Sequence, residues 1–80
     1  MGQKAYLLIE TAVGKTGEVA KFLEGQTWLD SVERMTGPYD IVAVAHAPEG
    51  CKIDDLANDG IKGLDGIAWM AVCPISIDQT

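Results

Sequence analysis

One stretch of the sequence, MTGPYDIVAVAH at residues 35–46, brings together residue types that can bind a ligand. A glycine, a proline, an aromatic ring and a carboxylate stand in a row there, as Gly37, Pro38, Tyr39 and Asp40, directly before an apolar run. Glycine and proline are typical of tight turns. The stretch is therefore either a plain hairpin connection or the rim of a binding site, and the motif alone leaves both interpretations open.

Catalytic chemistry needs several reactive groups that converge, and the sequence offers few of them. His46 is the single histidine. The aspartates of segment 54–59 fall on the polar side of an expected helix, where charges are usually solvated. The pattern Gly14-x-x-Gly17 is too short and too generic for a phosphate-binding loop. We expect no catalytic residue, no metal site and no cofactor, and therefore no enzyme.

Composition argues against several classes of partner. The net charge is −6, the pI is about 4.4, and there is no run of Lys or Arg. Since basic residues supply most of the affinity for phosphate groups, we expect neither direct nucleic-acid binding nor membrane binding. The N-terminus lacks a secretory pattern, which predicts a cytoplasmic protein. Cys51 and Cys73 lack metal-type spacing, and we expect two buried free thiols.

Periodicity and turn residues predict the elements that position the motif. The expected order is a strand at 5–11, a helix at 18–24, strands at 29–36 and 41–47, a helix at 51–63 and a strand at 67–77. This β-α-β-β-α-β order is that of the ferredoxin-like α+β sandwich. The four strands should lie in the spatial order second, third, first, fourth. Residues 1–80 form a single domain in this interpretation.

Two helices can cover only one face of such a sheet, so the strand patterns should indicate whether the other face is polar. The first, third and last strands are apolar on both faces, and only the second, an edge strand, alternates well. In the first strand Tyr6 and Leu8 oppose its other apolar side chains, and in the third strand Val42 and Val44 do the same. The last strand is expected to place Ile67, Trp69, Ala71, Cys73 and Ile75 on one face. A monomer would expose an unusually large apolar patch, which predicts sheet-to-sheet dimerisation.

Most of the chain resembles a known family. The segments TGPYDIVAVAHAPE, SVERMTG, AYLLIETAVGKTGEVAKFLEG and IKGLDGIAWMAVCPI resemble the effector-binding domain, or RAM domain, of the Lrp/AsnC (feast/famine) transcription regulators. The turn Gly37–Asp40 joined to an apolar strand is the most specific part of the match. Full-length members also carry an N-terminal DNA-binding domain. This chain begins at its first strand and resembles the stand-alone form.

The resemblance implies a dimeric α+β barrel built by sheet-to-sheet packing, with dimers associating into a ring such as an octamer or decamer. It also implies a small effector, in that family usually an amino acid, bound between dimers near Gly37, Pro38, Tyr39 and Asp40. Further partners would be full-length Lrp/AsnC regulators. The implied function is a sensing and oligomerisation module linked to transcriptional regulation, without DNA binding of its own.

The turn has the chemistry that an amino-acid zwitterion needs. Asp40 can meet its ammonium, backbone N–H groups can meet its carboxylate, Gly37 allows close approach, Pro38 stiffens the turn, and Tyr39 offers an apolar wall. One departure from the family is the stretch Ala68–Ala71, which lacks the hydroxyls of the usual Thr-x-Thr pattern. Two alternatives stay open, a ligand-free structural assembly module and a small dimeric α+β barrel enzyme.

Overall fold

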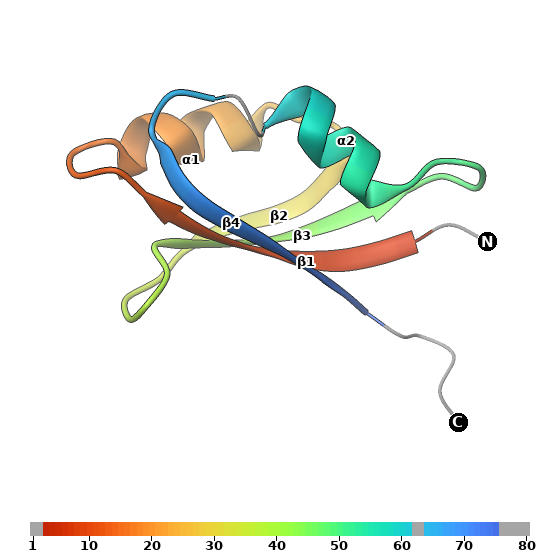
Figure 1. The fold of residues 1–80 in the computed structure, drawn as a ribbon, viewed down its shortest axis with the longest axis horizontal. Helices are drawn as coiled ribbons and strands as arrows, with labels where there is room; N and C mark the ends of the chain where they lie inside the picture. The colour runs from red at the N-terminus through yellow and green to blue at the C-terminus, as the bar shows by residue number, and fades with distance from the viewer. Residues whose placement is uncertain (1–2, 62–63, 76–80) are drawn as a thin grey trace.

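The computed structural model describes residues 3–61 and 64–75. Its elements are β1 (Gln3–Thr11), α1 (Thr16–Glu24), β2 (Leu29–Arg34), β3 (Ile41–Ala47), α2 (Ile53–Gly60) and β4 (Ile67–Pro74). The predicted β-α-β-β-α-β order is confirmed. The predicted sheet order, β2-β3-β1-β4, is confirmed as well, and each neighbouring pair runs antiparallel. Both helices lie on one face of the sheet (Figure 1).

The core lies between the sheet and the two helices, and strand alternation creates it. In β3 every second residue is buried, and in β1 the buried side chains likewise alternate with more exposed ones up to Thr11. The helices add Val19, Leu23, Ile53 and Ala57 from their inner faces. Three of the four buried residues of β3 are alanines, so the helices can approach this strand closely. The fold therefore follows from apolar residues spaced at two in the strands and at three to four in the helices.

Helix α2 is shorter than the pattern predicted. It begins at Ile53 rather than at residue 51, because Lys52 is extended (φ −114°, ψ 140°) and the Ile53 N–H donates to Gln3 Oε1 at 3.1 Å. The side chain of β1 thus caps the helix start. Helix α1 begins two residues earlier than predicted, at Thr16. Residues 62–63 and 76–77, which were assigned to the second helix and the last strand, lie outside the described residues.

The last strand corrects one prediction of side-chain direction. Glu10 pairs with Trp69 and Thr11 with Ile67, so Ala68 is an extra residue that forms a bulge. The bulge reverses the alternation at this point. Ile67 therefore packs against the core, while Trp69 points to the opposite face. Simple alternation had placed both on one face.

The thiols also differ from expectation. Cys51 is exposed, in the loop between β3 and α2, and Cys73 is half-buried on β4. Both are free. The prediction of two buried thiols was wrong, because the loop that carries Cys51 runs outside the helix it was assigned to.

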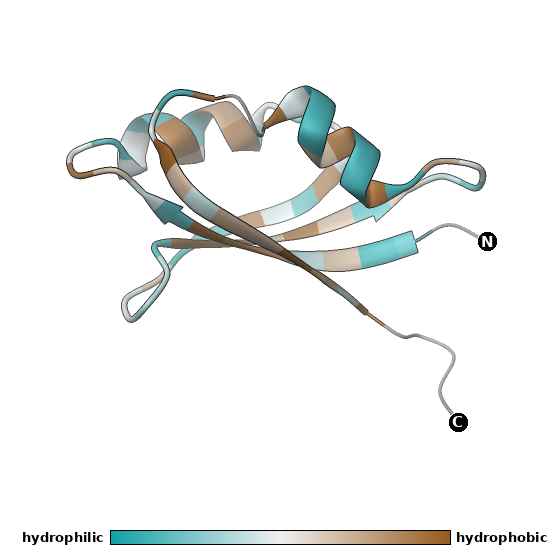
Figure 2. Cartoon of the chain, viewed as in Figure 1, coloured by the Kyte–Doolittle hydropathy of each residue, from teal (hydrophilic) through white to brown (hydrophobic). Residues whose placement is uncertain are grey.

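The face of the sheet away from the helices is called the open face below. Its middle is apolar and is formed by Tyr6, Leu8, Val42, Val44, Ala71 and Cys73. Figure 2 shows how apolar colour continues along the inner strands. Among the described residues no helix covers this face (Figure 1). The structure holds one chain, so sheet-to-sheet pairing stays a prediction.

Candidate functional site

The candidate site is the turn between β2 and β3, and backbone hydrogen bonds hold its base. Met35 N–H donates to the Asp40 carbonyl at 2.9 Å, which closes the turn. Asp40 N–H donates to the Ile9 carbonyl at 2.9 Å, which ties the turn to β1. Gly37 has φ +127°, a conformation that side chains rarely allow, so the turn requires glycine there. The turn projects to the side of the open face (Figure 1).

Asp40 anchors the end of β1. Its Oδ2 accepts hydrogen bonds from Thr11 N–H at 2.8 Å and from Thr11 Oγ1 at 3.1 Å. Thr11 Oγ1 also lies 2.6 Å from Thr16 Oγ1 at the start of α1. Since a hydroxyl carries one hydrogen, Thr11 gives its own to Asp40 and accepts that of Thr16. The carboxylate therefore links the turn, β1 and α1. Its Oδ1 accepts no hydrogen bond within the described residues.

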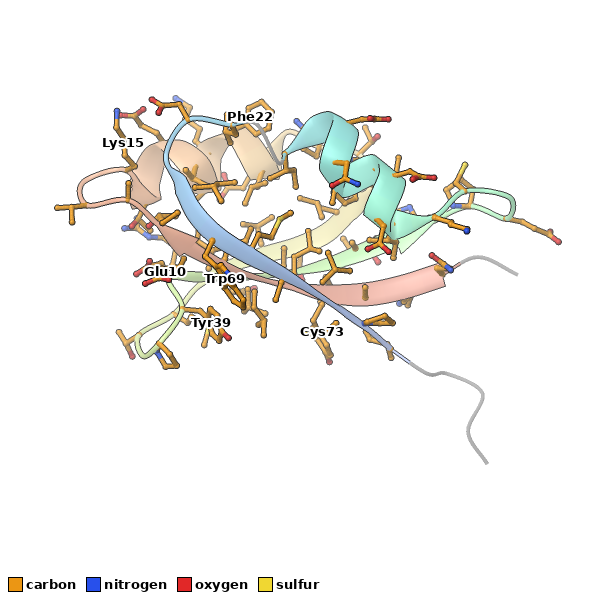
Figure 3. All side chains as sticks on the ribbon, viewed as in Figure 1. Glu10, Lys15, Phe22, Tyr39, Trp69 and Cys73 are labelled. Carbon is orange, nitrogen blue, oxygen red and sulfur yellow. The ribbon has the colours of Figure 1, made fainter. Side chains whose placement is uncertain are left out.

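Tyr39 turns the other way and crosses the open face. Its ring stacks on Trp69 of β4, with centroids 5.6 Å apart and an interplanar angle of 21°. The turn leads into β3, and β1 lies between β3 and β4. Tyr39 therefore reaches over the end of β1 to meet Trp69. Figure 3 shows the two rings together, with Glu10 of β1 beside them.

The four predicted residues thus have different positions. Tyr39 and Asp40 are half-buried and make specific contacts on the two sides of the β1 end. Gly37 and Pro38 form the exposed tip, and a side chain at Gly37 would have open space around it. The structure brings together the aromatic ring and the carboxylate. It leaves the tip open to a ligand or to another chain.

Sequence reasoning missed the two threonines that hold Asp40. It also missed a polar group at the far end of the open face, where Lys4 Nζ lies 3.9 Å from Asp30 Oδ2 and His46 Nδ1 lies 2.7 Å from Asp30 Oδ1. The second contact is an ion pair when the ring is protonated, but it lacks the alignment of a hydrogen bond. Lys4 and His46 are direct partners in the β1–β3 register. The bulge that brings Asp30 to them has no local sequence pattern.

The described residues contain no cluster of three or more His, Cys, Asp or Glu side chains suited to a metal ion. They also contain no helix that is long and apolar enough to cross a membrane.

Comparison with known proteins finds solved structures with the same fold. The sequence matches no family model and no curated protein. Among solved structures, FFRP-DM1 is 20% identical with a TM-score of 0.85, and the match covers 91% of this chain and 97% of that one. PH0061 is 20% identical with a TM-score of 0.81, and the match covers 99% of this chain and 55% of that one. MtbAldR is 10% identical with a TM-score of 0.78, and the match covers 100% of this chain and 57% of that one.

These neighbours share the fold. FFRP-DM1 and MtbAldR are proteins of the Lrp/AsnC family. The ferredoxin-like fold of the single chain is therefore confirmed, whereas its sheet-to-sheet pairing stays a prediction. This chain spans nearly all of FFRP-DM1 but only about half the length of PH0061 and of MtbAldR.

Proposed function

We propose that this chain is an Lrp/AsnC-type module that binds a small molecule, in this family usually an amino acid, and that assembles with copies of itself. Its role is transcriptional regulation without DNA binding or catalysis of its own, in the cytoplasm. The single observation that carries the proposal is the turn at residues 37–40. The turn is anchored by Asp40 and by Tyr39, yet its tip is exposed.

An amino-acid zwitterion fits the chemistry of this turn. The Oδ1 atom of Asp40 is available for the ligand's ammonium group, while Oδ2 keeps the turn in place. Backbone N–H groups of the exposed tip would meet the ligand's carboxylate, because consecutive N–H groups in a turn form anion-binding concavities. Open space at Gly37 permits close approach of the ligand to the backbone.

Self-assembly places this turn at an interface. The apolar open face pairs two copies, and the dimers form a ring through contacts near the turn. Full-length Lrp/AsnC regulators would join through the same surfaces. Half-buried apolar side chains such as Leu8 and Val44 support the dimer, since a chain of 80 residues buries only about 60% of its unfolded surface by itself.

A ligand-free assembly module is the second candidate, and two observations favour it. Asp40 already has a structural role through Thr11. The stretch Ala68–Ala71 offers no hydroxyl for a ligand. In this case the turn would serve only as a contact between dimers.

A panel of amino acids tests the two candidates. Each amino acid is added at millimolar concentration and the thermal unfolding midpoint is measured, with sedimentation velocity as the second readout. A sensor gains stability by RT ln(1 + [L]/Kd), so ligand at a hundred times Kd adds about 2.7 kcal/mol. We expect at least one amino acid to raise the midpoint. If none does while the protein still assembles, the assembly module is correct.

A further inference from the structure

Glu10 is an unpaired carboxylate beside an aromatic pair. It is exposed and makes no ion pair or hydrogen bond with any described residue. It lies directly across from Trp69 in the β1–β4 register, a position in which Cβ atoms are about 5 Å apart. Trp69 is 47% exposed despite its stacking on Tyr39. The three side chains gather at one end of the open face (Figure 3).

The nearest basic side chains of β1 and of the following loop are occupied elsewhere. Lys4 lies at the other end of β1, with Asp30. Lys15 Nζ lies 3.9 Å from carboxylate oxygens of both Glu18 and Asp65. Neither is paired with Glu10. The negative charge beside the two rings is therefore not neutralised by these groups.

A recess lies along β4 at the bulge. A volume of about 270 Å³ is lined by Ile67, Ala68, Trp69 and Met70. This recess is small, below the range of about 300–1,000 Å³ that is typical of drug-sized ligands. Because β4 is an edge strand in the described sheet, its outer backbone groups are available to hydrogen-bond a small polar molecule.

An aromatic face beside a carboxylate is a recognition element for organic cations. A cation placed over a tryptophan or tyrosine ring is attracted by the ring's electrons, and the attraction grows when water is excluded. A carboxylate adds a charge-assisted hydrogen bond, and a guanidinium group can make two such bonds at once. An uncharged aliphatic side chain would use the rings but leave Glu10 unpaired.

We infer that the ligand of this module carries a cationic side chain, an ammonium or a guanidinium group, which Glu10 binds while Trp69 and Tyr39 stack against it. This inference rests on the proposed function and specifies its ligand class. The α-ammonium and α-carboxylate groups are held by the turn. The side-chain cation extends to the acid–aromatic group formed by Glu10, Trp69 and Tyr39 on the open face.

Calorimetric titration with matched ligands is the test. L-Arginine is compared with L-citrulline, which has the same shape but no charge, and L-lysine with L-norleucine. We expect arginine or lysine to bind about ten- to a hundred-fold more tightly than its neutral counterpart. In Glu10→Gln this preference should disappear, because affinity for the cation falls and affinity for the neutral ligand does not. Trp69→Leu should weaken the cation's binding roughly two- to thirty-fold.

Glu33→Gln is the matched control. Glu33 is another exposed glutamate of the open face, paired with Val42 on the far side of β3 from β1. Its substitution removes the same charge and should leave the preference unchanged. Sedimentation of each variant verifies that the assembly is intact.

The failures of the two proposals can be told apart. If a neutral amino acid binds as tightly as arginine and lysine, or if Glu10→Gln keeps the preference, the sensing function stands and the cationic class is wrong. If Glu33→Gln loses the preference for the cationic ligand as fully as Glu10→Gln does, the preference comes from the overall negative charge of the protein. That result would also overturn the inference. If no amino acid binds wild-type protein, both proposals fail.

Discussion

At the scale of single residues, Asp40 combines an observed structural contact with a proposed role in ligand binding. One carboxylate oxygen accepts hydrogen bonds from Thr11, and the other accepts none within the described residues. The same side chain therefore has a structural role and a proposed functional role. Two substitutions separate these roles, because asparagine keeps an acceptor oxygen and alanine does not.

We predict that Asp40→Ala destabilises the fold by about 1–3 kcal/mol, since it leaves the N–H of the buried Thr11 without its acceptor. Asp40→Asn should cost less, because its side-chain carbonyl can still accept that bond. Urea unfolding measures both. In Asp40→Asn the affinity for an amino-acid ligand should nevertheless fall roughly ten- to a hundred-fold, because the bond to the ammonium loses its charge assistance. Equal affinity in wild type and Asp40→Asn would show that Asp40 is structural only.

At the scale of elements, the side-chain directions in the inner strands β1 and β3 could be predicted from the sequence, whereas those in the bulged strand β4 could not. The open-face positions of Tyr6, Leu8, Val42 and Val44 follow from alternation, because β1 and β3 pair without a register shift along the whole of β3. Ile67 was misplaced because a bulge depends on which residue of β1 each residue of β4 meets. That pairing has no local sequence pattern.

The same distinction holds for the candidate site. The motif at 37–40 marks the turn and its aromatic and acidic residues. The partner of Asp40 is Thr11, 29 residues away along the chain, and only the packing of the strands brings the two together. The cross-strand pair of Glu10 and Trp69 likewise depends on the register after the bulge. The residue types at the site could be identified from the sequence, whereas the contacts between distant segments could not be predicted from it.

The connection from α2 into β4 supports a prediction about Gly66. It has φ +104°, and a Cβ atom there would lie 3.1 Å from both Lys15 Cβ and Val19 Cγ2. Its carbonyl accepts from Ala12 N–H at 2.7 Å, so the backbone cannot shift freely. We predict that Gly66→Ala lowers the free energy of unfolding by about 1–3 kcal/mol or more, because it adds backbone strain and crowding.

Gly50→Ala is the control for that experiment. Gly50 has φ +90°, but a Cβ atom there meets nothing within 4 Å. Gly50→Ala should lower the free energy of unfolding by only about 1–2 kcal/mol, which is the cost of a left-handed backbone conformation. Denaturant unfolding should therefore give Gly66→Ala a lower free energy of unfolding than Gly50→Ala. The reverse order would contradict the packing of this turn against α1.

At the scale of the whole molecule, the open face predicts assembly. Val44 is half-buried in the single chain, so Val44→Asp should leave the isolated chain folded. In a sheet-to-sheet dimer the same carboxylate would be buried without a partner, at a cost of several kcal/mol. We expect wild type to sediment as a dimer or larger at micromolar concentration and Val44→Asp to sediment as a monomer.

Val13→Asp provides the comparison, since Val13 is fully exposed in the loop after β1. It should assemble like wild type. A well-folded wild-type monomer of 8.5 kDa under the same conditions would contradict sheet-to-sheet pairing.

The charge of the whole molecule predicts its behaviour toward DNA. With a net charge of −6, the chain should show no mobility shift of duplex DNA even at low salt, where non-specific binding is strongest. A salt-sensitive complex at submicromolar protein would contradict this. If the proposed assembly with full-length Lrp/AsnC regulators occurs, mixing with such a regulator should change the shift that the regulator produces.

The bulges at the two sheet edges have a consequence for solubility. In β4 the row of backbone groups is interrupted at Ala68 and ends at Pro74. In β2 the register shifts between Leu29 and Ser31, and the strand ends in charged residues. Interrupted, charged or proline-containing edges are poor templates for adding further strands. At high concentration we therefore expect these chains to resist growth into fibrils, and we expect the proposed association through the faces of the sheet to end in a closed particle.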